Sequence, residues 1–540
     1  MGTKAVRHVL RLLAAFPLLV ASAAIVSADE FRTPAISAVR VEWRAALDQL
    51  RSEIITQPAV ASAFTFLGRR RLGPFDPRST PALVQLNAVT SQIFTGIARS
   101  PVPVLLPLDT AAFFGARLNG APESLSLSRY QADFRPADLF DAGPAGYDAV
   151  FSLEPGAGDG MPQRTFAKPI EVQITGSILT YDIRDPLGGK GEPVRGLAAQ
   201  YPDLRRFIRE GYVRYAFTRF GVPYVVSIQC LDSTPRPLRL ACREAYPVAE
   251  RFLKALRIAG GLPSRPGMDI PSGIAERPVA RSPDFTYRPS GDIIANSGFR
   301  KQGGRTDFTT YSQIRFPLEK APAFAHSQSF RERRSNDKPL MLDELVGGNS
   351  GYLWQDNFCE ARSFGVGQCA SGFGHQGQDI RPGACPPTAG PQRCDRNQQA
   401  IVAVRDGVLI RSAKQQAATL QINSYNEHIR FRYMHMNPAS MDADGILNGR
   451  RVNEGEKIGL VSNYLDRPNG TSLHLHFDVQ VFTRDGWLWV NPYVTLIAAY
   501  ERLIRGRGRE IGPESVSLPA VAHASPKDAL RPEREEDGDD

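Results

Sequence analysis

The chain has 540 residues, of which 42% are hydrophobic and 22% are charged, and its formal net charge is +9. This length is too great for one ordinary domain and predicts two or three folded units. Because the positive charge is spread along the chain and forms no dense basic block, we expect no nucleic-acid binding.

The N-terminus has the pattern of a secretory signal peptide. Three basic residues precede a short apolar run that ends in Val26-Ser27-Ala28. This pattern predicts that residues 1–28 are cleaved on export, and the alternative is an uncleaved anchor helix. No later stretch is apolar and long enough to span a membrane. We therefore expect an exported protein of the periplasm or cell envelope, without a transmembrane segment after cleavage.

The six cysteines are even in number, so disulfides are expected in an exported chain. Each cysteine has a neighbour a short loop away, and no C-x-x-C pair typical of a cysteine zinc site occurs. Other connectivities among the last four cysteines are possible. The simplest pairing joins Cys230 to Cys242, Cys359 to Cys369, and Cys385 to Cys394.

Residues 29–261 are predicted to form an α+β domain of unknown function. Helical periodicity predicts one helix over 35–55, and a second over 245–261 that ends on two glycines. Apolar runs between them predict strands, including a hairpin around Gly221-Val222-Pro223. The other strand candidates are 102–108, 147–153 and 170–183.

The composition changes after this region. Residues 262–308 are rich in Pro, Gly, Ser and Arg, which predicts a linker or an extended arm. Short apolar runs broken by Gly, Asn and Pro predict a mainly antiparallel β domain over 309–505. Residues 506–540 end in RPEREEDGDD and are predicted to be a disordered tail.

Three short stretches of the predicted β domain carry five of the chain's eight histidines. In the first, GFGHQGQDI, the glycines predict a tight loop leading into a strand, so that His375 and Asp379 reach one ion. On its own this stretch is more typical of a surface loop. In the second, HIRFRYMHM, strand alternation places His435 with Phe431 on the apolar face and His428 on the opposite, solvated face. The alternative for His435 is a packed core histidine.

The third stretch, SLHLHFDVQV, alternates regularly. Leu475 and Phe477 belong to its apolar face, while His474, His476 and Asp478 project from the other face of a half-buried strand. One imidazole can bind a metal while the other faces the open side of that metal. Two histidines and one carboxylate leave a coordination position for water, as in catalytic zinc sites.

Together these stretches resemble the lysostaphin/LytM-type zinc metallopeptidases, which cut peptide bonds in bacterial peptidoglycan. The family pattern combines H-x-G-x-D, Y-x-H and H-L-H-F-[ED]. This chain has HQGQD at 375–379, YMH at 433–435 and HLHFD at 474–478. The segments AIVAVRDGVLI, RRVNEGEKIGLVSN and WVNPYVTL are also similar to family strands, the last to a closing strand. The resemblance covers about 310–500 in the family order.

The resemblance implies a small antiparallel β domain (the duplicated hybrid motif fold) with a groove that hosts an extended peptide. It implies one Zn²⁺ ion per chain, bound by His375, Asp379 and His476. His435 and His474 would orient the attacking water, move its proton and stabilise the tetrahedral intermediate. The implied function is a zinc-dependent endopeptidase that hydrolyses cross-links between peptidoglycan stem peptides.

Two features depart from the family pattern. An insertion at 381–399 lies near the site and would shape or cover the groove. The approach to H-L-H, SNYLDRPNGTS, has fewer glycines and is bulkier than in the family. Both features affect substrate choice, so cross-links between meso-diaminopimelate and D-alanine and glycine bridges are both compatible with the sequence.

Two other classes of protein compete with this interpretation. A non-catalytic module of the same fold would bind peptidoglycan or activate another hydrolase, although such members usually lack a ligand. A non-haem iron oxygenase also uses two histidines and one carboxylate, but export and the flanking motifs count against it. Residues 29–261 would position the enzyme, block its groove or bind a regulatory partner.

Overall fold

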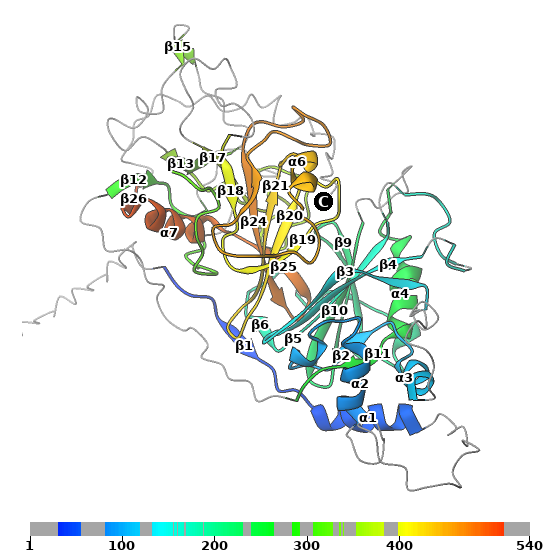
Figure 1. Ribbon diagram of the computed structural model, residues 1–540. Helices are drawn as coiled ribbons and strands as arrows, with labels where there is room; N and C mark the ends of the chain where they lie inside the picture. The colour runs from blue at the N-terminus through cyan, green and yellow to red at the C-terminus, as the bar shows by residue number, and fades with distance from the viewer. Residues whose placement is uncertain are drawn as a thin grey trace, which may run out of the picture. The chain divides into compact units, whose positions relative to one another are not determined.

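The computed structural model describes residues 31–55, 82–118, 132–263, 283–291, 306–327, 334–335, 338–339, 353–382 and 398–511, with short gaps at 155, 159, 167–168, 187 and 231–238. The predicted signal peptide and the predicted Cys385–Cys394 pair lie outside these residues, as does the tail after residue 511. Within the described ranges, no helix combines the length and the apolar character needed to cross a membrane. This part of the chain is mostly β-sheet, and both of its large sheets are antiparallel (Figure 1).

The first large sheet has the strand order β3-β4-β5-β10-β9-β8-β7. Strand alternation directs Tyr147, Ala149 and Phe151 to one of its faces. There, the ring of Phe151 lies 5.6 Å from that of Phe252 in helix α4. The predicted hairpin is confirmed, since β9 and β10 pair along their whole lengths. The strands are β3 (Phe134–Gly143), β4 (Gly146–Leu153), β5 (Glu171–Ser177), β7 (Glu192–Pro193), β8 (Arg205–Arg209), β9 (Tyr212–Arg219) and β10 (Val222–Gln229).

The other elements before residue 263 are short. Both predicted helices were too long: residues 36–38 pair with β6 as a strand, and Leu256 turns to extended backbone so that β11 follows α4. The predicted Cys230–Cys242 disulfide is present beside α4. These elements are β1 (Ile36–Ala38), α1 (Trp43–Ile55), α2 (Ala82–Thr90), η1 (Ile97–Arg99), β2 (Val104–Leu106), α3 (Thr110–Leu118), β6 (Leu179–Tyr181), η3 (Arg195–Leu197), α4 (Ala245–Ala255) and β11 (Arg257–Gly260).

The second large sheet has the strand order β13-β17-β24-β21-β20-β19-β22, and β25 also pairs with β24. β24 lies between β17 and β21, so side chains from three strands meet around it. On one face, the rings of Phe431 and Tyr433 lie 6.0 and 5.3 Å from that of Phe477. The strands are β13 (Ala323–Ala325), β17 (Gln378–Pro382), β19 (Gly407–Ile410), β20 (Ala418–Asn423), β21 (His428–Met434), β22 (Arg451–Val452), β24 (Leu475–Thr483) and β25 (Gly486–Val490).

Shorter elements complete this part of the chain. β12, within the predicted linker, pairs in parallel with β16 and with β26, so ordered structure continues into the segment predicted to be a disordered tail. Helix α7 replaces part of the strand expected in WVNPYVTL, because β25 ends before Asn491-Pro492. The elements are β12 (Pro283–Tyr287), β14 (Arg334–Ser335), β15 (Lys338–Pro339), β16 (Leu353–Trp354), β18 (Ala400–Val402), α6 (Pro438–Ala443), β23 (Lys457–Leu460), α7 (Tyr493–Ile504) and β26 (Arg507–Glu510).

The two large sheets pack against each other through a buried polar cluster. The carboxylate of Asp148 in β4 accepts hydrogen bonds from His428 at 2.7 Å, Arg430 at 3.0 Å and Gln421 at 2.6 Å. The prediction that His428 is solvated is therefore wrong, because the first sheet covers this end of the polar face. An apolar cluster lies at the same contact and comprises Phe207, Ala216, Val225, Phe482 and Trp487.

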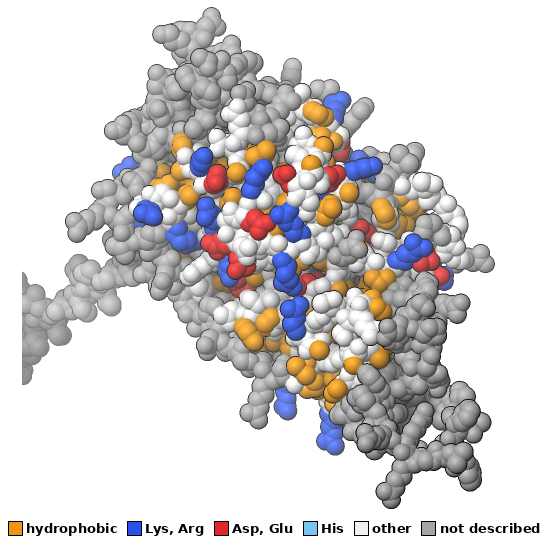
Figure 2. All heavy atoms as spheres, in the orientation of Figure 1, with side chains coloured by type: hydrophobic (Ala, Val, Ile, Leu, Met, Phe, Trp, Pro, Cys, Tyr) orange, Lys and Arg blue, Asp and Glu red, His pale blue; other side chains and the backbone are white. Residues whose placement is uncertain are grey.

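Charged side chains are mixed on the face of the molecule shown in Figure 2. Lys and Arg side chains lie among Asp and Glu side chains and among apolar ones across the described part of this face. Other basic residues are buried in ion pairs, such as Arg214 with Glu210 at 3.0 Å. On the described part of this face, the positive charge is therefore spread among acidic and apolar side chains.

Candidate metal centre

Three of the predicted site residues meet where β24 pairs with β17. Asp379 of β17 and His476 of β24 lie directly opposite each other in the strand register. Directly opposite residues project to the same face of a sheet. His375 lies in the loop that leads into β17, as the sequence predicts, and it reaches the same point.

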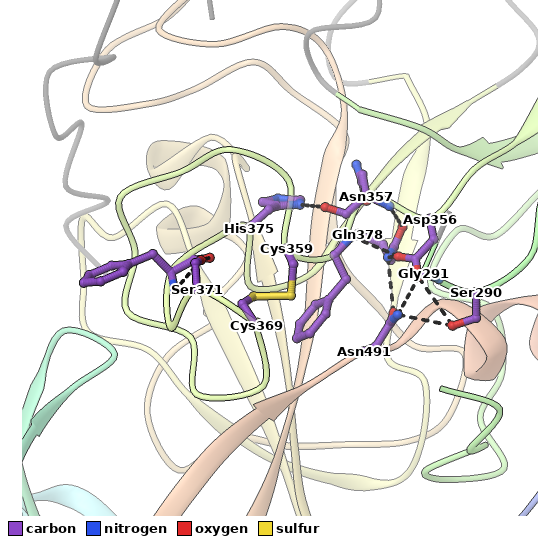
Figure 3. The surroundings of a disulfide bond; sticks show 12 residues. Ser290, Gly291, Asp356, Asn357, Cys359, Cys369, Ser371, His375, Gln378 and Asn491 are labelled. Carbon is purple, nitrogen blue, oxygen red and sulfur yellow. Dashed lines mark hydrogen bonds between the residues drawn. A yellow bond between two sulfur atoms is a disulfide. The ribbon is translucent and has the colours of Figure 1, made fainter. Parts of the chain in front are cut away.

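The loop that carries His375 is fixed by backbone hydrogen bonds and a disulfide. The amide of His375 donates to the carbonyl of Glu360 at 2.9 Å, and its carbonyl accepts from the amide of Cys359 at 2.8 Å. The predicted Cys359–Cys369 bond closes this loop beside His375 (Figure 3). Nδ1 of His375 donates to the carbonyl of Asn357 at 3.0 Å. Nε2 is therefore left as the basic nitrogen that faces the site.

Gly377, the glycine of H-x-G-x-D, allows a close approach between this loop and β24. A Cβ atom at this position would lie 2.4 Å from the carbonyl oxygen of Phe477 and 2.9 Å from Nε2 of His476. Any side chain here would push the loop and the strand apart. The glycine thus lets the His375 loop lie directly against the His476 ring.

The three candidate ligand atoms form a small triangle. Nε2 of His375 lies 2.9 Å from Nδ1 of His476, and Oδ1 of Asp379 lies 3.3 Å from each of them. A tetrahedral zinc ion with bonds of about 2.0–2.1 Å separates its ligand atoms by about 3.3 Å. All three side chains are buried, and together they form a group able to hold a metal. The donor set therefore fits one zinc ion and leaves a fourth position for another ligand.

His435 and His474 lie beside this triangle. Their ring centroids are 4.7 Å apart, and Nε2 of His474 lies 3.3 Å from Oδ1 of Asp379. His435 follows the last residue of β21 with φ of +68°, and its ring lies 6.1 Å from that of His476. This left-handed backbone takes the side chain out of strand alternation. The prediction that His435 shares the apolar face with Phe431 is therefore wrong, and its ring joins the site.

Backbone carbonyls fix the tautomers of these two histidines. Nδ1 of His435 lies 3.1 Å from the carbonyl oxygen of Tyr464, and Nδ1 of His474 lies 2.8 Å from that of Ser472. A carbonyl only accepts hydrogen bonds, so Nδ1 carries the proton in both rings. Each ring is left with a basic Nε2.

Burial and neighbouring charges set the protonation states of the site. Burial alone would raise the pKa of Asp379, but His375 and His474 hold it well below its usual range. Burial lowers the pKa of His435 well below that of a free imidazole, and it also lowers the pKa of His474. Burial acts in the same direction on His476, but the carboxylates of Asp379 and Asp478 outweigh it and raise the pKa of His476. At neutral pH, Asp379 is therefore ionised, and both His435 and His474 are neutral.

Sequence reasoning missed several neighbours of the site. Asn357 holds His375, and Oε1 of Gln416 lies 3.3 Å from Nδ1 of His435. The amide of His326 donates to the carbonyl of Asp379 at 3.0 Å, and burial lowers the pKa of the His326 ring to about 3. No motif marks these positions, because tertiary contacts bring them to the site. The pairing of β13 with β17 places His326 there, and the amide of Met436 donates to the carbonyl of Gln416 at 3.2 Å.

No family model matches the chain, and no curated protein matches it. Among solved structures, the chain is similar to the crystal structure of a protein from Ruminococcus gnavus assigned as a glycyl-glycine endopeptidase LytM, with 18% sequence identity and a TM-score of 0.17. The match covers 25% of this chain and 49% of that protein, so the chain spans about half of its length. A TM-score this low supports no conclusion, which leaves the motifs and the geometry of the site as the basis for a function.

Proposed function

We propose that this protein is a zinc-dependent endopeptidase that hydrolyses peptide cross-links in bacterial peptidoglycan. One observation carries the proposal: residues from motifs as far as 101 positions apart meet in one buried cluster. Three of them form the metal triangle, and two more lie beside it with basic nitrogens. The five residues are His375, Asp379, His435, His474 and His476.

The three residues of the triangle and the two histidines beside it have different roles. His375, Asp379 and His476 would hold the metal, with Asp379 as the one anionic ligand. When bound there, zinc polarises the scissile carbonyl and lowers the pKa of a water molecule at its open position.

His435 and His474 supply proton transfer. A neutral imidazole whose Nδ1 proton is donated to a backbone carbonyl presents a basic Nε2. Such a nitrogen takes the proton of the attacking water and returns it to the leaving amine. A ring that has gained a proton also becomes a donor that stabilises the oxyanion. The close contact between the two rings lets them share these tasks.

The proposed substrate agrees with the compartment that the cysteines indicate. Among the described residues, Cys230–Cys242 and Cys359–Cys369 form disulfides, and such bonds persist in oxidising compartments. Peptidoglycan lies outside the cytoplasm, where an exported chain would meet its stem peptides. The proposal therefore places the protein in the periplasm or cell envelope.

Digestion of purified, cross-linked sacculi by the zinc-loaded full chain tests the proposal. We expect cross-linked muropeptides to decrease and uncross-linked ones to increase, as measured by chromatography and mass spectrometry. His476→Ala should abolish this change, because it removes a metal ligand. Tyr425→Ala is the matched control and should remain active, since Tyr425 is 62% exposed between β20 and β21. Zinc-loaded protein that binds sacculi but leaves every cross-link intact would favour the non-catalytic module instead.

A further inference from the structure

His476 differs from the other three histidines of the site in the nitrogen that faces the centre. His375, His435 and His474 each place Nδ1 against a backbone carbonyl, at 3.0, 3.1 and 2.8 Å respectively. His476 instead turns Nδ1 toward the centre, 2.9 Å from Nε2 of His375. Its Nε2 points the other way, to Oδ2 of Asp478 at 3.4 Å.

Asp478 is a buried carboxylate held from both sides of β24. Nε of Arg432 in β21 donates to its Oδ2 at 2.7 Å, and Nε1 of Trp489 in β25 donates to its Oδ1 at 3.0 Å. Asp478 is fully buried, and Arg432 lies opposite it in the strand register. Donors from two neighbouring strands thus fix the position of this carboxylate.

The chemistry of a metal-bound imidazole requires an acceptor on the far side of the ring. An imidazole that binds metal through Nδ1 carries its proton on Nε2, and a buried N–H without an acceptor is costly. Nε2 of His476 is buried and makes no aligned hydrogen bond to the described residues. Asp478 provides the carboxylate oxygen within reach, and the absence of a side chain at Gly377 leaves room beside the ring.

We propose that Asp478 is a positioning residue of the metal centre. It accepts the Nε2 proton of His476 and so fixes the tautomer and the ring orientation that present Nδ1 to the metal. Arg432 and Trp489 hold Asp478 in place. A carboxylate in this position also makes the imidazole a stronger ligand than a backbone carbonyl would. The inference rests on the metal centre of the proposed function but not on its substrate.

The zinc affinity of the full chain, measured by competition with a chromophoric chelator, tests this role. The side chain of Asn has one acceptor oxygen, whereas Arg432, Trp489 and His476 all direct a donor to position 478. Asp478→Asn should therefore weaken zinc binding by about 10–100-fold. Asp478→Glu keeps two carboxylate oxygens and should recover much of the affinity. Asp148→Asn is the matched control, because Asp148 is also buried and paired with an arginine and a histidine but does not touch the ligands. It should leave zinc affinity unchanged.

A second measurement needs no variant and stands even if Asp478→Asn does not fold. Long-range ¹⁵N–¹H correlation spectra of the zinc-bound wild type report which nitrogen of each histidine is protonated. We expect His476 to be protonated at Nε2 and His375 to be protonated at Nδ1. A His476 ring protonated at Nδ1, or a folded Asp478→Asn variant with wild-type zinc affinity, would overturn the inference. Zinc-binding protein that cleaves no sacculi would defeat the proposed function alone.

Discussion

His435 and His474 lie next to the metal triangle but outside it. Their rings contact each other, and backbone carbonyls hold the Nδ1 side of both. The ligand atoms come from other residues, so metal binding and proton transfer are assigned to different side chains. The two functions should therefore be separable by mutation.

His435→Ala and His474→Ala should keep their zinc but lose hydrolysis. General acid–base groups typically contribute about 10²–10⁴-fold to a rate, so we expect losses of that size. Zinc content by mass spectrometry and initial rates on a defined cross-linked muropeptide measure the two effects separately. His375→Ala provides the contrast and should lose zinc and activity together. If either alanine variant were folded but free of zinc, the division of roles would be wrong.

At this scale the sequence predicted which residues meet but not how each of them gets there. The resemblance of the three motifs to the peptidase family implied that His375, Asp379 and His476 bind one metal, and the structure brings the three together. His435 was placed on the wrong face because alternation holds only inside a strand, and β21 ends at Met434. The positive φ at His435 has no signature in a single sequence.

Strand pairing and one disulfide-closed loop fix the positions of the metal-site residues. β24 pairs with β17 and β21, and the register aligns His476 with Asp379 on one side and with Met434 on the other. His375 lies in a loop outside the strands of the large sheet, and this loop contains one short antiparallel bridge, between Gly365 and Phe373. The Cys359–Cys369 disulfide and the hydrogen bonds to Cys359 and Glu360 hold this loop in place.

Replacing Cys359 and Cys369 together by Ser should weaken the metal centre as well as the fold. Loss of a disulfide that closes a loop of this size should lower the free energy of unfolding by about 2–3 kcal/mol. Zinc affinity should fall too, because the His375 loop is no longer fixed. Urea unfolding and chelator competition measure the two quantities. The matched control replaces Cys230 and Cys242, whose disulfide lies beside α4. That pair should destabilise the protein without changing zinc affinity, and equal zinc affinities in both double variants would contradict the role of the loop.

Elements were predicted well where alternation was long and poorly where an apolar run was short. His474 and His476 both lie 3.3 Å from Oδ1 of Asp379, as expected for residues on one side of a strand. The strand is not half-buried, however, because the first sheet covers part of its polar face. The run after Pro492 is a helix buried on all sides, which periodicity does not distinguish from a buried strand.

In the whole molecule, the buried cluster around Asp148 joins the two large sheets. Asp148→Asn leaves the buried Arg430 without its charge partner, and removing one member of such a pair typically costs about 3–5 kcal/mol. We expect a loss of this order in the free energy of unfolding near neutral pH. Urea denaturation of the wild type and the variant measures it.

The effect of Asp148→Asn should depend on pH in a defined direction. Burial alone would raise the pKa of Asp148, but His428 and Arg430 lower it below its usual value. The ionised form is thus favoured in the folded state, so its contribution is complete above the unfolded pKa of about 3.9 and is lost as the pH falls through the lower folded value. The difference between wild type and variant should be constant near neutral pH and shrink in acid. A difference that grows in acid would contradict this assignment.

The packing of the two sheets could not be predicted from the sequence. Asp148 and His428 are 280 residues apart, and each lies in a strand that alternates as if one face met water. Local periodicity gives no information about which face of one sheet will cover another. The contact became visible only from the tertiary structure.

Because the chain is synthesised from its N-terminus, the first sheet is made long before the strands that cover it. Trp487 donates a hydrogen bond to Thr175, which is 312 residues earlier. All seven strands of the first sheet have been synthesised by residue 229, but the strands that cover its second face extend to residue 490. Until then, apolar side chains such as Phe207 and Val225 lack their covering partners. A nascent or truncated chain that ends before β25 would therefore expose an apolar patch prone to aggregation.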